Sequence, residues 1–297
     1  MNAWRLLLLL LASLARARDD VDGPQLPAPP PNGNPCRNST FGALPFCDPA
    51  STVDARVADL LRRLTLAEKI TQLTTGNGVN GGTSDNALPR LGIPAFDWWS
   101  EGTHGVKGAY NAGPHTNFAL PISTAMSFNR SLWSKTAQQI AREARSWYNA
   151  GNLGRGLTYW TPVINLARDP RWGRNLECPG EDPVLSSAYA EAFVRGFQEA
   201  PEAPGTLLAG ATCKHFVANS MERSSDDGIA FGREDFDAAV SPRDLVDSYL
   251  APFQACVEKG NAAGLMCSYN SVNGFPTCAW PWLLNTTARG QWGFDGV

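Results

Sequence analysis

The stretch LTYWTPVINLARDPRWGRNLECPGEDP, residues 157–183, carries the clearest information about the fold. Its first part, 157–167, is apolar and rich in aromatic and β-branched residues, which is typical of a buried strand. The second part, 168–183, holds three arginines, four acids and three prolines, and its prolines exclude a helix. A buried strand that runs directly into a charged loop is how barrels and open α/β sheets present a functional site.

The same succession of strand-like runs and helical patterns recurs along the chain. Further strand-like or apolar runs lie at 92–99, 120–127, 207–219 and 262–274, and helical patterns at 51–74, 130–150, 186–200 and 241–260. Such alternation predicts an α/β fold with a parallel sheet and covering helices. No G-x-G-x-x-G lies between a strand and a helix, so we expect a (β/α)8 TIM-type barrel that is incomplete at the C-terminus.

Polar residues gather where the expected strands end. Asp97 and Glu101 follow one run, 168–177 follows the next, Lys214-His215 ends a third, and Tyr269-Asn270 follows a fourth. In a TIM barrel the carboxyl ends of the strands meet at one face, and the active site is built there. The sequence therefore predicts that these clusters converge.

Several kinds of chemistry are disfavoured by what the chain contains. Its three histidines, His104, His115 and His215, fall in no tight metal-ligand spacing, so no metal site is expected. A G-x-S-x-G nucleophile elbow is missing. With a net charge of −3 the chain has no basic field for nucleic acid, and no segment after the N-terminus is long and apolar enough to span a membrane.

The remaining interpretation is a pocket of acids and arginines beside tryptophans. Charged groups make strong hydrogen bonds to vicinal hydroxyls, and aromatic faces cover the C–H surface of a sugar ring, so the set suits a pyranose. Structural interpretations stay open beside it. The charges of 168–174 could form an ion-pair network under the barrel mouth, His215 could be a structural histidine, and the tryptophans could be core.

The N-terminus predicts a secreted protein. Arg5, an apolar run and Ala15-Arg16-Ala17 form a secretory signal at 1–17, cut near Ala17. Residues 18–50 are expected to be a disordered or loop lead-in and 51–297 the partial barrel. Acceptor triplets for glycosylation begin at Asn38, Asn129 and Asn285.

Seven cysteines fit an oxidising compartment. Cys36 with Cys47, and Cys267 with Cys278, are plausible local bridges, although sequence alone leaves the connectivity open. Because seven is odd, one thiol is free or its partner lies on another molecule or on chain outside this sequence.

Five motifs carry a resemblance to a known family. The order WWSEGTHG (98–105), RDPRWGRNLECPGED (168–182), CKHF (213–216), MCSYNSVNG (266–274) and QWGFDG (291–296) resembles the N-terminal barrel of glycoside hydrolase family 3. It is most similar to the secreted β-xylosidase and α-L-arabinofuranosidase branch of plants and fungi. The resemblance implies hydrolysis of terminal β-D-xylosyl residues of xylo-oligosaccharides or xylan with retention, no cofactor, and an oligosaccharide as the partner, with no protein partner indicated.

The resemblance also implies roles for five residues. Glu101 matches a carboxylate that holds hydroxyls of the sugar to be cleaved, and Arg174 matches a sugar-binding arginine. Lys214 and His215 match the family's Lys-His pair, and Tyr269 a tyrosine near the nucleophile. Many glucosidases of the family carry Asp at the position of Glu101, so the longer side chain is expected to fill the space of a glucose hydroxymethyl group.

The catalytic carboxyl groups are expected outside this sequence. The family's nucleophile is an aspartate just after Val297, Asp295 is not that residue, and the acid/base belongs to a later domain. The resemblance thus implies that the 297 residues alone are inactive and are a fragment of an enzyme. Within the family, β-glucosidase and α-L-arabinofuranosidase remain alternatives. Outside it, the alternative is a non-catalytic secreted sugar-binding barrel.

Overall fold

The computed structural model describes residues 35–37, 40–74, 86–96, 98–107, 115–150, 156–226 and 229–297. The expected signal peptide, the triplet asparagine Asn38 and the predicted cluster member Asp97 lie outside these ranges. The chain divides into two compact units, of which the first comprises Met1–Thr75 and Asp85–Ala95 and the second comprises Gly76–Ser84 and Phe96–Val297. The predicted domain boundaries at residues 17 and 50 stay predictions.

The first unit is helical in its described part. The single helix expected over 51–74 is divided there, because Thr65 and Glu68 form a capping box that starts a new helix. The Thr65 N–H donates to Glu68 Oε2 (2.8 Å) and the Glu68 N–H to Thr65 Oγ1 (3.2 Å). The elements of this unit are η1 (Pro35–Arg37), η2 (Pro45–Cys47), α2 (Val53–Arg63), α3 (Leu66–Thr74) and η3 (Pro89–Leu91).

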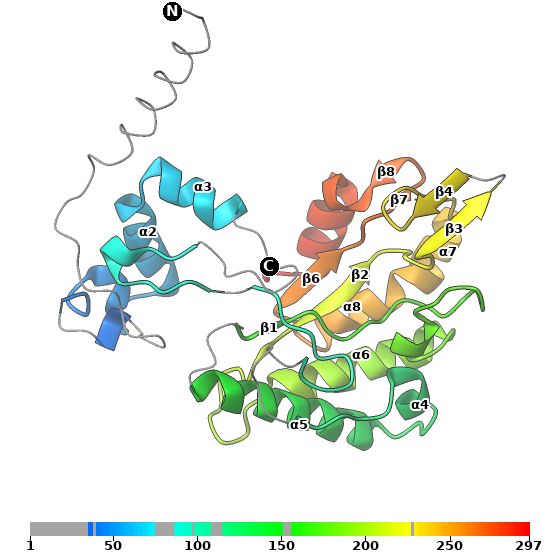
Figure 1. The fold of residues 1–297 in the computed structure, drawn as a ribbon, viewed down its shortest axis with the longest axis horizontal. Coiled ribbons are helices and arrows are strands. Elements are labelled where there is room, and N and C mark those ends of the chain that lie inside the picture. The colour runs from blue at the N-terminus through cyan, green and yellow to red at the C-terminus, as the bar shows by residue number, and fades with distance from the viewer. Residues whose placement is uncertain are drawn as a thin grey trace, which may run out of the picture. The chain divides into compact units, whose positions relative to one another are not determined.

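The second unit alternates helices and strands (Figure 1). Its helices are α4 (Pro121–Ala125), α5 (Arg130–Asn149), η4 (Asn175–Glu177), α6 (Pro183–Gln198), α7 (Pro242–Asp244), η5 (Leu245–Tyr249), α8 (Ala251–Glu258), η6 (Thr277–Ala279) and η7 (Trp282–Gln291). Its strands are β1 (Thr158–Tyr159), β2 (Gly210–Phe216), β3 (Arg223–Asp226), β4 (Ile229–Gly232), β5 (Asp237–Ala238), β6 (Gly264–Cys267), β7 (Ser271–Val272) and β8 (Phe275–Pro276).

The central sheet is parallel and follows the order of the chain. Strands β1, β2 and β6 lie side by side in that order. Ser100 forms a parallel bridge to Tyr159 on one side of them. On the other side the Leu265 N–H donates to Val297 O at 2.9 Å. Parallel neighbours in chain order are what consecutive strands of a (β/α)8 barrel form, so the predicted fold is confirmed.

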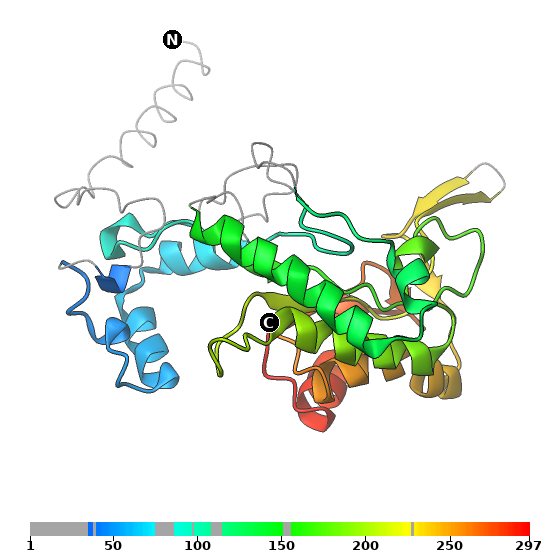
Figure 2. The same cartoon turned by 90° about the horizontal axis from the view of Figure 1, so that it is seen from below.

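Helices α5, α6 and α8 form the layer that covers this sheet (Figure 2). Phe193 and Phe197 of α6 are buried in the core between the helices and the strands. Gly196 allows the close approach of α6 to α5, because a Cβ atom there would lie 2.2 Å from the backbone oxygen of Ser134.

One of the strand-like runs is helical. Residues 120–127 were expected to be an apolar strand, but they contain helix α4. Pro121 occupies the first helical position, where its fixed φ and missing N–H are tolerated, and this start signal outweighs the apolar character of the run. The described residues of 92–99 form no strand, and pairing with β1 begins only at Ser100.

Three disulfides are present among the described residues. The two local bridges, Cys36–Cys47 and Cys267–Cys278, are confirmed. A third, Cys213–Cys256, joins β2 to α8 across 43 residues of sequence. Cys178 is the free thiol, and its complete burial raises its pKa, so it has little thiolate character.

Candidate functional site

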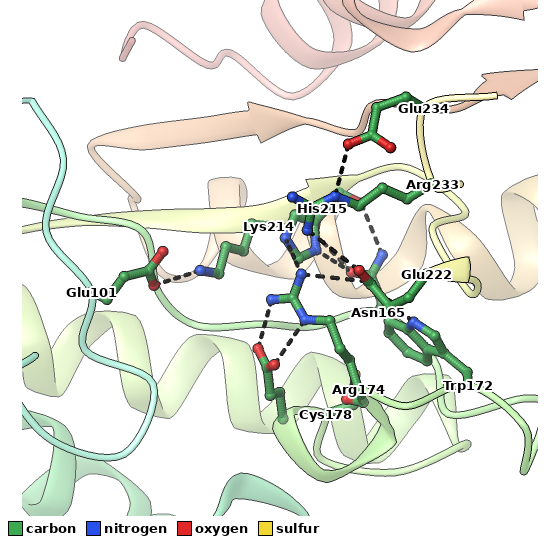
Figure 3. A network of polar contacts seen from close by, with 11 residues as sticks. Glu101, Asn165, Trp172, Arg174, Cys178, Lys214, His215, Glu222, Arg233 and Glu234 are labelled. Atoms are coloured by element: carbon green, nitrogen blue, oxygen red, sulfur yellow. Dashed lines mark hydrogen bonds and ion pairs between the residues drawn. The ribbon is translucent and has the colours of Figure 1, made fainter. Parts of the chain in front are cut away.

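The site is built around two consecutive residues of β2, Lys214 and His215, which are both 3% exposed. Successive side chains of a regular strand point to opposite faces. Here the pairing register between β2 and β6 shifts between Lys214 and Phe216, as in a β-bulge. A bulge re-aims side chains, and Figure 3 shows Lys214 and His215 as members of one polar network.

Lys214 forms an ion pair with Glu101. Its Nζ lies 2.6 Å from Glu101 Oε2. The indole N–H of Trp99 donates to the other carboxylate oxygen of Glu101 at 3.1 Å. Burial lowers the pKa of Lys214, although the charge and hydrogen bond of Glu101 act in the opposite direction. The Glu101 carboxylate is thus held between two donors and keeps lone pairs for a ligand.

Arg174 lies at the centre of the network. Its Nε and Nη2 donate to the two carboxylate oxygens of Glu177, both at 2.7 Å, and its Nη1 lies 3.6 Å from Glu222 Oε1. Burial of Arg174 disfavours its charge, but the acids, Glu177 first, outweigh it and raise its pKa. The bidentate pair fixes the plane of the guanidinium group.

His215 is a neutral hydrogen-bond acceptor toward Arg174. The Asn165 amide N–H donates to His215 O (2.8 Å), and Asn165 Oδ1 accepts the His215 backbone N–H (2.8 Å). Since that oxygen also lies 3.0 Å from His215 Nδ1, the proton is on Nδ1. Nε2 then faces Arg174 Nη1 at 3.3 Å as an acceptor. Burial, with Lys214, Arg174 and Arg233, holds the pKa of His215 well below 6.5.

Because His215 is buried in its neutral form, we expect the folded chain to lose stability in mild acid. In the unfolded chain His215 takes up a proton near its ordinary pKa of 6.5, whereas the folded state excludes the proton until lower pH. Below pH 6.5 the unfolded state therefore binds more protons than the folded state. Because of His215, the free energy of unfolding should fall by up to about 1.4 kcal/mol for each unit by which the pH is lowered. Urea unfolding at a series of pH values measures this free energy. In the His215→Gln variant it should depend less steeply on pH than in the wild-type chain. An equal dependence would contradict the assignment of His215 as a buried neutral histidine.

The charged loop that follows β1 is braced by its own residues. Arg171 donates to Asp169 Oδ2 at 2.6 Å, and these hydrogen bonds lower the pKa of Asp169 to about 2. The Asn175 amide donates to the backbone oxygen of Asp169 at 2.6 Å. Arg171 is exposed, so the Arg171–Asp169 pair is outside the buried network.

A pocket of about 570 Å³ opens beside the network, within the range of ligand-binding cavities. Of the five predicted sugar-binding residues, Glu101, Arg174 and Lys214 line it. His215 does not line the pocket, but its Nε2 contacts Nη1 of Arg174. Tyr269 does not line the pocket. It is 47% exposed, and the Arg233 guanidinium lies 4.9 Å from its ring centroid.

Sequence reasoning missed residues that hold the network together. Glu222 accepts from Arg233 Nη1 at 3.3 Å and from the Trp172 indole N–H at 3.4 Å. Asn165 orients His215. No sequence pattern singles out Glu222 or Asn165, because each acts through partners that are far away along the chain. Trp172 lies within the quoted motif 168–182, whereas Arg233 lies in none of the five motifs.

A metal site and a membrane-spanning helix can be looked for only among the described residues. Within those ranges no three His, Cys, Asp or Glu side chains gather where a metal ion could be held. Within the same ranges no helix has the length and apolarity needed to cross a bilayer.

The chain is similar to proteins of one known family. Residues 55–297 match a family model described as the glycosyl hydrolase family 3 N-terminal domain. Beta-xylosidase/alpha-L-arabinofuranosidase 1 of Medicago sativa subsp. varia is 45% identical over 88% of this chain and 33% of its own. Probable beta-D-xylosidase 7 of Arabidopsis thaliana is 44% identical over 99% of this chain and 37% of its own.

Solved structures agree in fold. A family 3 exo-beta-xylosidase in complex with a xylobiose aziridine probe matches with a TM-score of 0.76 and 29% identity, over 88% of this chain and 32% of that one. Beta-glucosidase 3B of Thermotoga neapolitana, in complex with α-D-glucose, matches with a TM-score of 0.66 and 32% identity, over 81% and 33%. The chain thus spans about a third of the length of the relatives it matches.

Proposed function

Because the chain belongs to glycosyl hydrolase family 3, we propose that it supplies the sugar pocket of a retaining exo-β-xylosidase. The enzyme would release terminal β-D-xylosyl residues from xylo-oligosaccharides and xylan. One observation supports this more than any other. The described pocket is lined at once by a carboxylate, Glu101, an ammonium, Lys214, and a guanidinium, Arg174, all prepositioned by other side chains. Charged donors and acceptors in this arrangement suit the vicinal hydroxyls of a pyranose.

Each proposed residue has a role that its contacts support. Glu101 would accept hydrogen bonds from sugar hydroxyls, because Trp99 and Lys214 already orient its two oxygens. Arg174 and Lys214 would donate. His215 would keep Arg174 in place from behind, and Tyr269 would approach the sugar only from outside the described pocket.

Catalysis itself is assigned to groups outside 1–297. Retaining glycosidases use two carboxyl groups about 5–5.5 Å apart, one as nucleophile and one as acid/base. Glu101 and Glu177 are each engaged by a cation, which suits binding better than proton donation. We therefore keep the nucleophile after Val297 and the acid/base in a later domain, and we expect the 297 residues alone to be inactive.

The specificity proposed for Glu101 gives a second prediction. Glu101→Asp shortens the side chain by one methylene and opens space for a hydroxymethyl group. A methylene in a specificity pocket is worth roughly tenfold or more in discrimination. The ratio of kcat/KM for aryl β-D-glucoside to that for aryl β-D-xyloside should rise by about that factor in the complete product of the source transcript. As the control, Glu177→Asp should leave the ratio unchanged, and an unchanged ratio in Glu101→Asp would contradict the proposal.

Secretion and glycosylation are part of the proposal. Three disulfides are typical of an extracellular or lumenal protein and support the predicted signal peptide. Asn129 and Asn285 are exposed, so both remain proposed glycosylation sites, together with Asn38. Asn129 also caps α5, with its Oδ1 accepting the Leu132 N–H at 3.0 Å.

The test is hydrolysis of aryl β-D-xyloside, α-L-arabinofuranoside and β-D-glucoside by the complete product of the source transcript. We expect the xyloside to have the highest kcat/KM. A faster arabinofuranoside or glucoside would favour one of the other activities of the family. If none is hydrolysed while the chain binds xylobiose, the non-catalytic sugar-binding barrel is the better description.

A further inference from the structure

We propose that the pocket wall formed by 104–107 and 115–117 is a subsite for a carboxylate carried by the substrate, as in a uronic acid branch on a xylo-oligosaccharide. The inference rests on the proposed function and extends it to acidic substrates. Lys107, His104 and His115 line this wall. The pocket is larger than one pentose ring, so the wall is available to a second sugar or a branch.

Among the described charged side chains that line the pocket, Lys107 is a cation without a carboxylate partner. Glu101 is paired with Lys214, and Glu177 with Arg174. Among the described residues, Lys107 forms no ion pair with a carboxylate. One unpaired ammonium matches one carboxylate on the ligand. A phosphate dianion would fit less well, because Glu101 and Glu177 line the same pocket and would repel it.

Contacts with the sugar-binding residues hold Lys107 in place. Its backbone N–H donates to the backbone oxygen of Glu101 at 2.8 Å. Its Nζ lies 4.6 Å from the ring centroid of Trp99, a cation–π distance. That indole donates to the Glu101 side chain. The ammonium group is therefore next to the proposed sugar site, and Lys107 is an exposed residue.

The two histidines are brought to the same wall by backbone packing. The Phe118 N–H donates to the backbone oxygen of His104 at 2.7 Å. Gly105 has φ of +153°, and a Cβ atom there would lie 2.5 Å from the Thr116 backbone oxygen, so only glycine permits this approach. Thr116 is anchored in turn to Glu143 of α5. The imidazole of His104 lines this wall and adds an N–H group that can donate to a carboxylate.

Binding to the full 297-residue chain tests the inference. The probes are xylobiose, xylobiose with a glucuronic acid branch, and xylobiose with a glucose branch, which has the same ring without the carboxylate. Titration calorimetry at low salt should show about tenfold tighter binding of the glucuronic acid form than of the glucose form, as a charge-assisted hydrogen bond provides. The preference should shrink as salt is added.

Variants assign the preference to one side chain. Lys107→Met should bring the ratio between the two branched sugars close to one, and Lys107→Arg should retain it. Lys135→Met, which changes an exposed lysine of α5 outside the pocket, should keep the wild-type ratio. Equal binding of the two branched sugars by the wild-type chain would overturn the inference and leave the proposed function standing. Failure of all three sugars to bind would overturn both.

Discussion

Replacing Arg174 by alanine should reduce kcat/KM on aryl β-D-xyloside by roughly a hundredfold or more in the complete product of the source transcript. Loss of one charge-assisted hydrogen bond to a sugar accounts for about 1.5–3 kcal/mol. The remaining effect comes from the neighbours of Arg174. Glu177 loses both of its short bonds, and Glu222 and His215 lose the same partner, so the pocket lining is free to rearrange. Binding of xylobiose to the 297-residue chain should fall below detection.

Arg171→Ala is the matched control for this experiment. Arg171 lies on the same loop, carries the same charge and also pairs with an acid, but its side chain is 89% exposed and does not line the pocket. Its removal should change kcat/KM by less than about twofold, as is usual for an exposed ion pair. If the two variants lose kcat/KM equally, the arginines act by stabilising the loop, and the proposed contact between Arg174 and the sugar is contradicted.

Removing the disulfide between β2 and α8 should destabilise the chain by about 4 kcal/mol. In the chain-entropy account the benefit of a disulfide grows with the loop that it closes, and this one spans 43 residues. Both sulfurs are completely buried, so the Cys213→Ala, Cys256→Ala double variant also loses packing in the core. Urea denaturation measures the change in the free energy of unfolding.

The bridge between Cys267 and Cys278 supplies the comparison. It spans 11 residues, and Cys278 lies on the surface, so its removal should cost clearly less. Equal losses in the two double variants would mean that loop length does not govern their effects. Because Cys213 directly precedes Lys214, the first double variant should also weaken xylobiose binding, and the second should not.

Much of the site was predictable because barrel strands deliver their last residues to one face. Glu101, Arg174 and Lys214 come from three separate motifs, and the structure brings all three to one pocket. Tyr269 obeys the same rule along the chain, but its ring packs with Arg233 and not in that pocket. The rule gives the end of the sheet at which a residue lies and does not give the direction of its side chain.

The supporting residues could not be predicted for a different reason. Asn165 holds His215 from 50 positions away, and Glu222 joins Arg174 to Arg233 from another loop. These pairs depend on the tertiary distance between loops, which no local pattern encodes. The helix at 121–125 was missed for a local reason, since five residues are too few for helical periodicity to appear.

The order of the central sheet has a consequence for how the chain acquires its structure. Ser100, β1, β2, β6 and Val297 are neighbours in the order in which they are synthesised. Each strand of this sheet therefore finds its partner already present at the growing edge. Within the described central sheet, no strand is inserted between two earlier ones. The sheet can thus grow one strand at a time while the ribosome is still extending the polypeptide.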